Sequence, residues 1–224
     1  MAPPRAESGL AYNTPMEMSS CDVSDACDAA GVDAVRTGTL RPVWPGCPPA
    51  SGRVATFRLA PAAEPAGVGR ESGGGRGGTA DDPVRDLIAG LDAAREPAQG
   101  AAEADIALVD LGGRTDLQCW GGVLARAALR SGFRAAVVHG AVRDVAELKR
   151  LRFPVFASGV FPGRARGRLR YAGAGDAVRV VPGGPAVLDG WAVAADASGA
   201  VFLPGTAAYE VFAAAQQAGA EQQL

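Results

Sequence analysis

The pattern of apolar and polar residues predicts five helices. In the first, the apolar residues from Val23 to Ala30 recur at helical spacing, Ser19 or Ser20 can cap the start, and Gly31 ends the helix. The predicted helices span residues 21–31, 82–94, 123–132, 144–151 and 206–219.

Other apolar runs predict strands. Residues 51–61 alternate in the way that is typical of a strand. Residues 104–111 and 133–140 are also predicted strands, and each is followed by a turn and a predicted helix. Residues 104–151 are therefore interpreted as two successive strand-turn-helix units of a parallel sheet. Three short strands are predicted farther along the chain, at residues 177–181, 191–196 and 200–204.

These elements indicate a single α/β domain over residues 1–224, a length that suits one medium domain with a full core. Residues 1–18 are expected to form a flexible N-terminus. Residues 63–82 contain too much glycine to pack and are expected to form a loop insertion. This segment is not a phosphate-binding loop, because the G-K-[ST] ending is missing.

Charge and composition argue against several classes of function. The net charge of -2 and the pI near 5.5 give no footprint for nucleic acid, and the arginines between residues 164 and 170 are interpreted as a solvated loop. The N-terminus lacks the apolar core of a signal peptide, and no run reaches the roughly 18 apolar residues of a membrane span. A cytoplasmic protein without membrane contacts is expected. The four cysteines have no C-x-x-C spacing and are expected to be free thiols.

The chain contains one histidine and one lysine, and this limits the catalytic mechanisms that it can use. The only histidine is His139, so a Ser-His-Asp triad would have to use it, and a packing or capping role at a strand end is the favoured interpretation. The only lysine, Lys149, lies on a highly charged helix, whereas a Schiff base needs a desolvated amine. Carbonyl chemistry would therefore need a hard metal ion held by carboxylate and water, Mg²⁺ or Mn²⁺ more readily than zinc.

Two predicted helix starts carry candidate site residues. In an open parallel sheet, ligands bind beyond the carboxyl ends of the strands, where helix N-termini present N–H groups to anions. Gly121 and Gly122 allow close approach of the backbone, and Arg143 offers a planar fork for a carboxylate or keto oxygen. Asp144 could hold a divalent cation directly or through water. Together these residues predict a site for a small anionic 2-keto acid.

The Arg-Asp pair also has an ordinary explanation. Asp is a favoured N-cap residue, and an Arg at a helix start commonly points into solvent. An exposed ion pair of this kind contributes under about 1 kcal/mol to stability. The sequence pattern alone leaves both interpretations open.

Five segments of the chain together match a known family pattern: "VSDACDAAGV", "LRPVWPG", "GRVATFRL", "CWGGVLARAALRSGFRAAVVHGAVRDVAELKRLRFPVFASGVFP" and "AADASGAVFLP". In these segments, from about Ser19 to Pro204, the chain resembles the RraA-like family. This family includes 4-hydroxy-4-methyl-2-oxoglutarate/4-carboxy-4-hydroxy-2-oxoadipate aldolases and the regulator of ribonuclease E activity, and many members were once misnamed dimethylmenaquinone methyltransferases. The resemblance implies the swivelling β/β/α three-layer fold and a homotrimeric ring or a hexamer of two rings.

The resemblance also implies roles for individual residues. Arg143 would bind the 2-keto acid substrate, and Asp144 would help to hold Mg²⁺ through its water shell. The backbone of Gly122, Val123 and Leu124 would hold the substrate carboxylate.

Three features depart from the family pattern. The aldolases carry an acidic residue twenty intervening positions before the Arg-Asp pair, and this position falls on Gly122. Residues 187–191, "VLDGW", stand where relatives usually have a Pro-Gly-Asp turn, and the glycine-rich insertion at 63–82 is longer than usual. Asp116, on the turn before Gly122, could substitute as the base.

The implied activity is a divalent-metal-dependent lyase that acts on a small 2-keto acid through a pyruvate enolate, as an oxaloacetate decarboxylase or an aldolase. Decarboxylation needs no hydroxyl proton removed, so the glycine at position 122 favours it over aldol cleavage. A non-catalytic protein-binding regulator and a biosynthetic enzyme that applies the same enolate chemistry to another substrate are the alternatives. A methyltransferase is disfavoured, because no strand-linked G-x-G signature is present.

Overall fold

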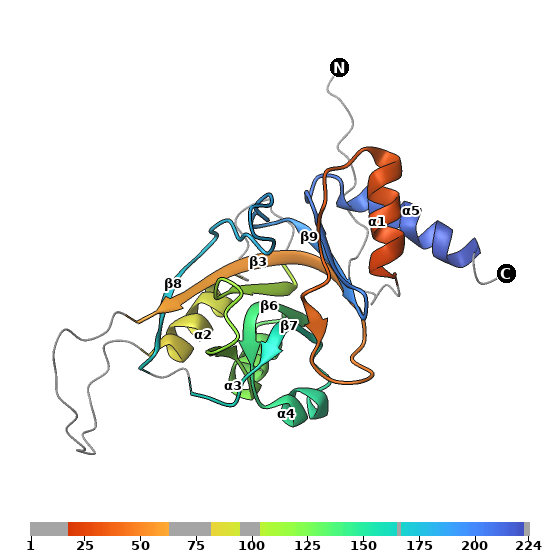
Figure 1. Ribbon diagram of the computed structural model, residues 1–224. Coiled ribbons are helices and arrows are strands. Elements are labelled where there is room, and N and C mark those ends of the chain that lie inside the picture. Colours follow the sequence, from red (N-terminus) through yellow and green to blue (C-terminus); the bar gives the residue numbers. More distant parts are fainter. Residues whose placement is uncertain (1–17, 63–81, 95–103, 165–166, 222–224) are drawn as a thin grey trace, which may run out of the picture.

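The computed structural model describes residues 18–62, 82–94, 104–164 and 167–221 (Figure 1). The expected flexible N-terminus and the glycine-rich loop lie outside the described residues, except for their last positions, Met18 and Asp82.

The described strands form one ten-stranded sheet in the order β1-β10-β9-β3-β4-β6-β7-β2, with β5 beside β6 and β8 beside β3. The strands are β1 (Val35–Thr37), β2 (Arg41–Pro42), β3 (Ala50–Pro61), β4 (Ile106–Asp110), β5 (Gln118–Trp120), β6 (Ala135–Val142), β7 (Val155–Val160), β8 (Leu169–Ala174), β9 (Ala192–Asp196) and β10 (Gly199–Leu203). The helices are α1 (Ser20–Ala30), α2 (Pro83–Ala93), α3 (Gly122–Arg130), α4 (Val145–Arg150) and α5 (Ala208–Glu221).

The parallel half of the sheet positions the candidate site. Strand β4 pairs in parallel with β3 and β6, and β6 pairs in parallel with β5 and β7. The chain runs from β4 through α3 to β6, and then through α4 to β7. The two predicted strand-turn-helix units are thus confirmed, and the carboxyl ends of β4, β5, β6 and β7 meet at one edge.

Three apolar clusters explain the layers. One lies between the parallel strands and helices α2, α3 and α4, and includes Trp120 stacked on Phe153 with ring centroids 6.2 Å apart. A second fills the curl of the sheet, where Phe156 and Phe202 are fully buried. A third packs α1 and α5 against β9 and β10, at the other end of the molecule (Figure 1). The result is the expected β/β/α arrangement around a curled half-barrel sheet.

Strand β3 joins the two halves. Its first residues, Ala50–Arg53, pair with β9, and its later residues, Val54–Arg58, pair with β4. The divergent "VLDGW" turn is tied to the same strand, because the Asp189 carboxylate accepts a hydrogen bond from the Thr56 N–H at 2.8 Å. This turn therefore has a structural role.

Several sequence predictions need correction. Residues 177–181 do not form a strand, because only an isolated bridge joins Val178 to Val187. Strand β5 lies inside the turn that was predicted between the strand at 104–111 and the helix at 123–132, and its three residues are too few to show a period. Arg170 belongs to β8 rather than to a loop, although its side chain is exposed as expected.

Two other expectations are met. All four cysteines are free thiols. Within the described residues, none of the helices is long and apolar enough to cross a bilayer.

A partly buried ion pair ties the amino ends of the parallel strands together. The Arg134 Nε donates to the Asp105 carboxylate at 3.0 Å, and a second Arg134 nitrogen donates to the Ser51 carbonyl at 3.2 Å. Burial raises the pKa of the Asp105 carboxyl above its usual 3.8, and the contacts with Arg134 act in the opposite direction. The folded state therefore depends on Arg134 to keep this carboxylate ionised.

We expect Arg134→Met to lower the free energy of unfolding at neutral pH by about 3 kcal/mol, because a buried carboxylate loses its partner. When folding raises the pKa of a carboxyl, the protonated carboxyl favours the folded state, and this contribution to stability is lost as pH rises through the folded pKa. Without Arg134 the folded pKa of Asp105 is higher, so the carboxyl stays protonated up to a higher pH. The deficit, measured by urea unfolding, should therefore be smaller near about pH 5 than near about pH 8.

Arg130→Met, on the exposed end of α3, is the matched control and should change stability by less than about 0.5 kcal/mol. An Arg134→Met deficit that is equal at both pH values would show that Asp105 is not the group left uncompensated.

Candidate functional site

The candidate site is built where buried strands end. All eight residues of β6 are buried, and the chain turns at Arg143 and Asp144 directly after Val142. The Arg143 N–H donates to the Trp120 carbonyl at 3.0 Å, which fixes the end of β6 beside the end of β5. This bond places the Arg-Asp pair next to the start of α3.

Asp144 has an uncommon backbone conformation. Its φ of 58° and ψ of 37° lie in the left-handed region, which non-glycine residues rarely occupy. It stands at the N-cap position of α4, but its side chain makes no capping hydrogen bond. Instead its Oδ2 accepts hydrogen bonds from the Gly122 N–H and the Arg143 Nε, both at 3.3 Å. The ordinary capping role therefore does not account for this residue.

The glycines at the start of α3 leave room for nearby charged side chains. Gly121 is extended, so its backbone would suit any residue, but a Cβ there would lie 2.9 Å from Asp144 Oδ2. A Cβ on Gly122 would collide with the carboxylate of Glu147. Because neither glycine has a side chain, the carboxylates of Asp144 and Glu147 can lie against the α3 backbone in the positions they occupy.

The first turn of α3 offers backbone donors. The earliest helical bond runs from the Ala125 N–H to the Gly121 carbonyl at 3.0 Å, so the N–H groups of Gly122, Val123 and Leu124 have no acceptor within the helix. Gly122 donates to Asp144. The Val123 side chain is exposed, whereas the Leu124 side chain is buried in the core.

Glu147 lies beside the candidate site and was not predicted from the sequence. It lies in the first turn of α4, three positions after Asp144, and its carboxylate forms an ion pair with Arg126 of α3. Residues three apart on a helix face the same side, and this spacing could have identified it. Two carboxylates, those of Asp144 and Glu147, therefore lie against Gly122.

Asp116 is placed differently from these residues. Its carboxylate accepts two hydrogen bonds from Arg114, at 2.9 Å and 2.6 Å, and its side chain is exposed. The hydrogen bonds from Arg114 lower the pKa of Asp116, which weakens it as a base. Among the described residues, no hydrogen bond joins Asp116 to Arg143 or Asp144.

His139 is buried as favoured, but it lies inside β6 rather than at a strand end. Its Nδ1 lies 2.8 Å from the Asp110 Oδ1, which also accepts the Gly112 N–H at 2.8 Å. Its Nε2 lies against Gly113, where a Cβ would come within 2.8 Å. The buried ring thus anchors the turn after β4. Lys149, as expected, is exposed in the last turn of α4.

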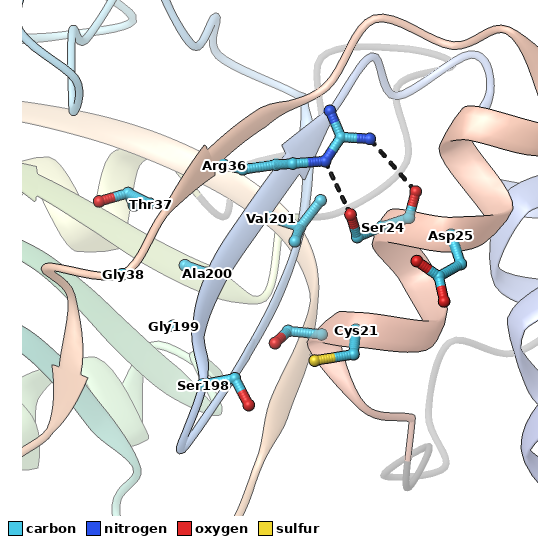
Figure 2. A pocket seen from close by; sticks show the side chains of 11 residues that line it. Cys21, Ser24, Asp25, Arg36, Thr37, Gly38, Ser198, Gly199, Ala200 and Val201 are labelled. Atoms are coloured by element: carbon cyan, nitrogen blue, oxygen red, sulfur yellow. Dashed lines mark hydrogen bonds between the residues drawn. The ribbon is translucent and has the colours of Figure 1, made fainter.

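A separate cavity of about 310 Å³ opens between α1, β1 and β10 (Figure 2). Arg36 lies at its edge, but its guanidinium donates to Ser24 Oγ at 2.7 Å and pairs with Asp28 at 2.5 Å. Among the described residues that line this cavity, Arg36 is the only cation, and Asp28 of α1 neutralises its charge. The Arg143 edge of the sheet is the better candidate for an anionic ligand.

Within the described ranges, no three His, Cys, Asp or Glu side chains gather closely enough to hold a metal ion together. The carboxylates of Asp144 and Glu147 both lie against Gly122 at the α3 start.

Comparison with known proteins identifies the family. The family model described as RraA-like, Aldolase/RraA, matches residues 20–202. The chain belongs to the RraA-like family. This family contains aldolase and decarboxylase enzymes as well as inhibitors of ribonuclease E.

Two curated relatives match over shorter stretches. Protein DlpA of Legionella pneumophila is 31% identical over 106 residues, which are 47% of this chain and 17% of that protein. The uncharacterized protein MJ0644 of Methanocaldococcus jannaschii is 42% identical over 50 residues, 22% of this chain and 24% of that protein. The chain thus spans less than a quarter of the length of each.

Solved structures match over most of the chain. RraAS2 of Streptomyces coelicolor, an unusual member of the RNase ES inhibitor RraA family, has a TM-score of 0.66 at 22% identity, over 92% of this chain and 90% of that one. The RNA-processing inhibitor RraA from Thermus has a TM-score of 0.57 at 25% identity, over 84% and 94% of the two chains. These RraA-like structures confirm the fold.

We expect Asp144→Gly to leave the free energy of unfolding unchanged or to raise it by up to about 1 kcal/mol, because glycine adopts the left-handed conformation without strain. Asp144→Val should lower stability, since a β-branched residue is poorly tolerated at positive φ. Thermal and urea unfolding of the two variants provide the measurement. A loss above about 2 kcal/mol in the glycine variant would assign Asp144 a structural role instead.

Proposed function

We propose that this RraA-like protein is a divalent-metal-dependent lyase that breaks a carbon-carbon bond in a small 2-keto acid. The conformation of Asp144 supports this most strongly. A strained residue whose carboxylate leaves its capping position to meet a guanidinium and a helix start is typical of a functional site. Oxaloacetate decarboxylation and cleavage of 4-hydroxy-4-methyl-2-oxoglutarate are the reactions that fit.

Substrate binding would use Arg143 and the start of α3. The Arg143 side chain is about one-third exposed, so its fork can reach a carboxylate or a keto oxygen of a ligand that arrives from solvent. The N–H groups of Val123 and Leu124, with the positive end of the helix dipole, suit a carboxylate. A small dianionic keto acid matches this donor set.

The carboxylates present also fit Mg²⁺ or Mn²⁺. Mg²⁺ is commonly held in proteins by one or two carboxylates together with water, and Asp144 supplies a partly exposed oxygen donor. A bound ion of this kind would act as a Lewis acid that stabilises negative charge on the 2-keto oxygen.

The chain's own residues would support the same charge development. As the carbon-carbon bond breaks, its electron pair moves toward the 2-keto carbonyl, and the Arg143 guanidinium is placed to stabilise the oxygen that gains charge. Asp144, through its bonds with Gly122 and Arg143, would hold the guanidinium and the helix start in register.

A non-catalytic regulator of RNA processing is the second candidate, because the Thermus relative is described as an RNA-processing inhibitor. Exposed apolar side chains at Val123 and Val160, near the edge of the sheet, would suit a protein contact. A biosynthetic enzyme with another substrate is the third. Pyruvate release from oxaloacetate, with and without Mg²⁺, separates an enzyme from a regulator.

RraA-like proteins are commonly oligomeric. We propose a homotrimer, or a hexamer of two trimers, located in the cytoplasm, with a small 2-keto acid as ligand and neither nucleic acid nor membrane as partner.

We expect excess EDTA to abolish pyruvate release from oxaloacetate and Mg²⁺ or Mn²⁺ to restore it, because the only lysine is exposed and unsuited to a Schiff base. Asp144→Ala should require a much higher metal concentration while its circular dichroism spectrum stays that of the natural protein. Full turnover in EDTA would overturn the proposed mechanism.

We expect Arg143→Lys to lose nearly as much activity as Arg143→Ala, about 2 to 4 kcal/mol of transition-state stabilisation, because an ammonium cannot make a two-pronged contact. Steady-state kcat/KM for oxaloacetate measures the loss. Arg150→Lys, an exposed arginine at the end of α4, is the matched control and should keep full activity. A lysine variant with near-normal turnover would show that only the positive charge of Arg143 matters.

A further inference from the structure

Glu147 reaches the candidate site from a direction that the motif does not predict. It extends from the first turn of α4 toward the start of α3, where one carboxylate oxygen pairs with Arg126 and the other lies against Gly122. Its side chain is about one-quarter exposed, so the group borders solvent rather than being enclosed.

The glycine at position 122 leaves room for the Glu147 carboxylate. A Cβ on Gly122 would lie 3.0 Å from the Cγ of Glu147 and would collide with its carboxylate. The same glycine donates its N–H to Asp144 Oδ2 at 3.3 Å. Glu147 and Asp144 therefore place two carboxylates against one backbone residue that has no side chain of its own.

The charges around Gly122 are balanced in the absence of a ligand. Arg126 and Arg143 supply two positive charges, and Asp144 and Glu147 supply two negative ones. A divalent cation together with a dianionic keto acid would preserve that balance. Removing the Glu147 charge would leave an excess positive charge and weaken the binding of a cation.

We propose that Glu147 is the second acidic group of this site and supplies the base for aldol cleavage. This inference rests on the proposed function. Its free oxygen orders water beside the cation and accepts, through water, the proton that leaves the 4-hydroxyl of a 4-hydroxy-2-keto acid. The hydroxyl becomes a carbonyl, the bond between C3 and C4 breaks, and its electron pair forms the enolate of the 2-keto product. The proton then returns to C3 of that enolate, so atoms and charge balance.

A purely structural role for Glu147 predicts something different. The ion pair with Arg126 joins α3 to α4, and a simple clamp would be broken equally by changing either partner. An acidic group of the site would not behave in this way, since only Glu147 carries the negative charge. Loss of Arg126 would remove a positive charge near the cation and should not weaken its binding.

The experiment compares Glu147→Gln, Arg126→Gln, Glu147→Ala and the double variant Gly122→Asp with Glu147→Ala. Binding of Mn²⁺ is followed by the electron paramagnetic resonance signal of the free ion, which does not depend on turnover. Cleavage of 4-hydroxy-4-methyl-2-oxoglutarate, decarboxylation of oxaloacetate and thermal unfolding are measured on the same samples.

Glu147→Gln, which keeps the size and the hydrogen bonding of the side chain, should weaken Mn²⁺ binding by about tenfold, the range seen when outer-sphere partners of a metal are lost. It should reduce aldol cleavage by about tenfold more than decarboxylation, because only cleavage needs the base. Arg126→Gln should bind Mn²⁺ as tightly as the natural protein or more tightly. The double variant should recover Mn²⁺ binding relative to Glu147→Ala, because the introduced aspartate occupies the space that the glutamate side chain leaves.

Three results would overturn the inference. Unchanged Mn²⁺ binding and an unchanged ratio of the two reactions in Glu147→Gln would remove Glu147 from the site. Equal weakening in Glu147→Gln and Arg126→Gln would assign it a clamping role. Natural protein that neither binds Mn²⁺ nor releases pyruvate from oxaloacetate would overturn the proposed function itself, and this result is distinct from the other two.

Discussion

The burial of strand β6 on both faces is the constraint on which the site depends. A strand covered on one face by helices and on the other by the curled half of the sheet cannot carry an unpaired charge, because desolvation would not be compensated. All eight residues from Ala135 to Val142 are buried, and His139, the polar one, is bonded to Asp110. Arg143 is the first residue after β6 and its side chain reaches solvent, so the end of the buried strand determines where the charged chemistry begins.

The local parts of the fold could be predicted from the sequence, and the long-range parts could not. The units from residue 104 to 151 are confirmed because their buried strands and amphipathic helices are encoded within short windows. Five strands were not predicted: β1, β2, β5, β7 and β8. A three-residue strand such as β5 has no period, and β8 forms by pairing with the far end of β3. The predicted strand at 177–181 failed because apolar residues there, such as Val178, pack into the curl of the sheet without extended pairing.

The difference between local and long-range interactions also explains which site residues could be predicted from the sequence. Gly121, Gly122, Arg143 and Asp144 come from two helix starts that a parallel topology must bring to one edge, and the structure brings them together. Glu147 was missed because its relevance depends on how α4 packs against α3, which spacing within one helix does not specify. The pairing of Asp116 with Arg114 likewise depends on the conformation of the turn between β4 and β5.

The relation between Gly122 and Glu147 shows why a site is better defined by charge in space than by residue type at one position. The energy with which a carboxylate beside the start of α3 stabilises a cation depends on the distance between the two charges. It does not depend on which helix carries the carboxylate. A side chain at position 122 and a glutamate at position 147 compete for one volume, so the chain can hold only one of them without rearrangement. Glycine at 122 then leaves the space that the Glu147 carboxylate occupies, so the acidic group beside the α3 start extends from α4 and not from position 122.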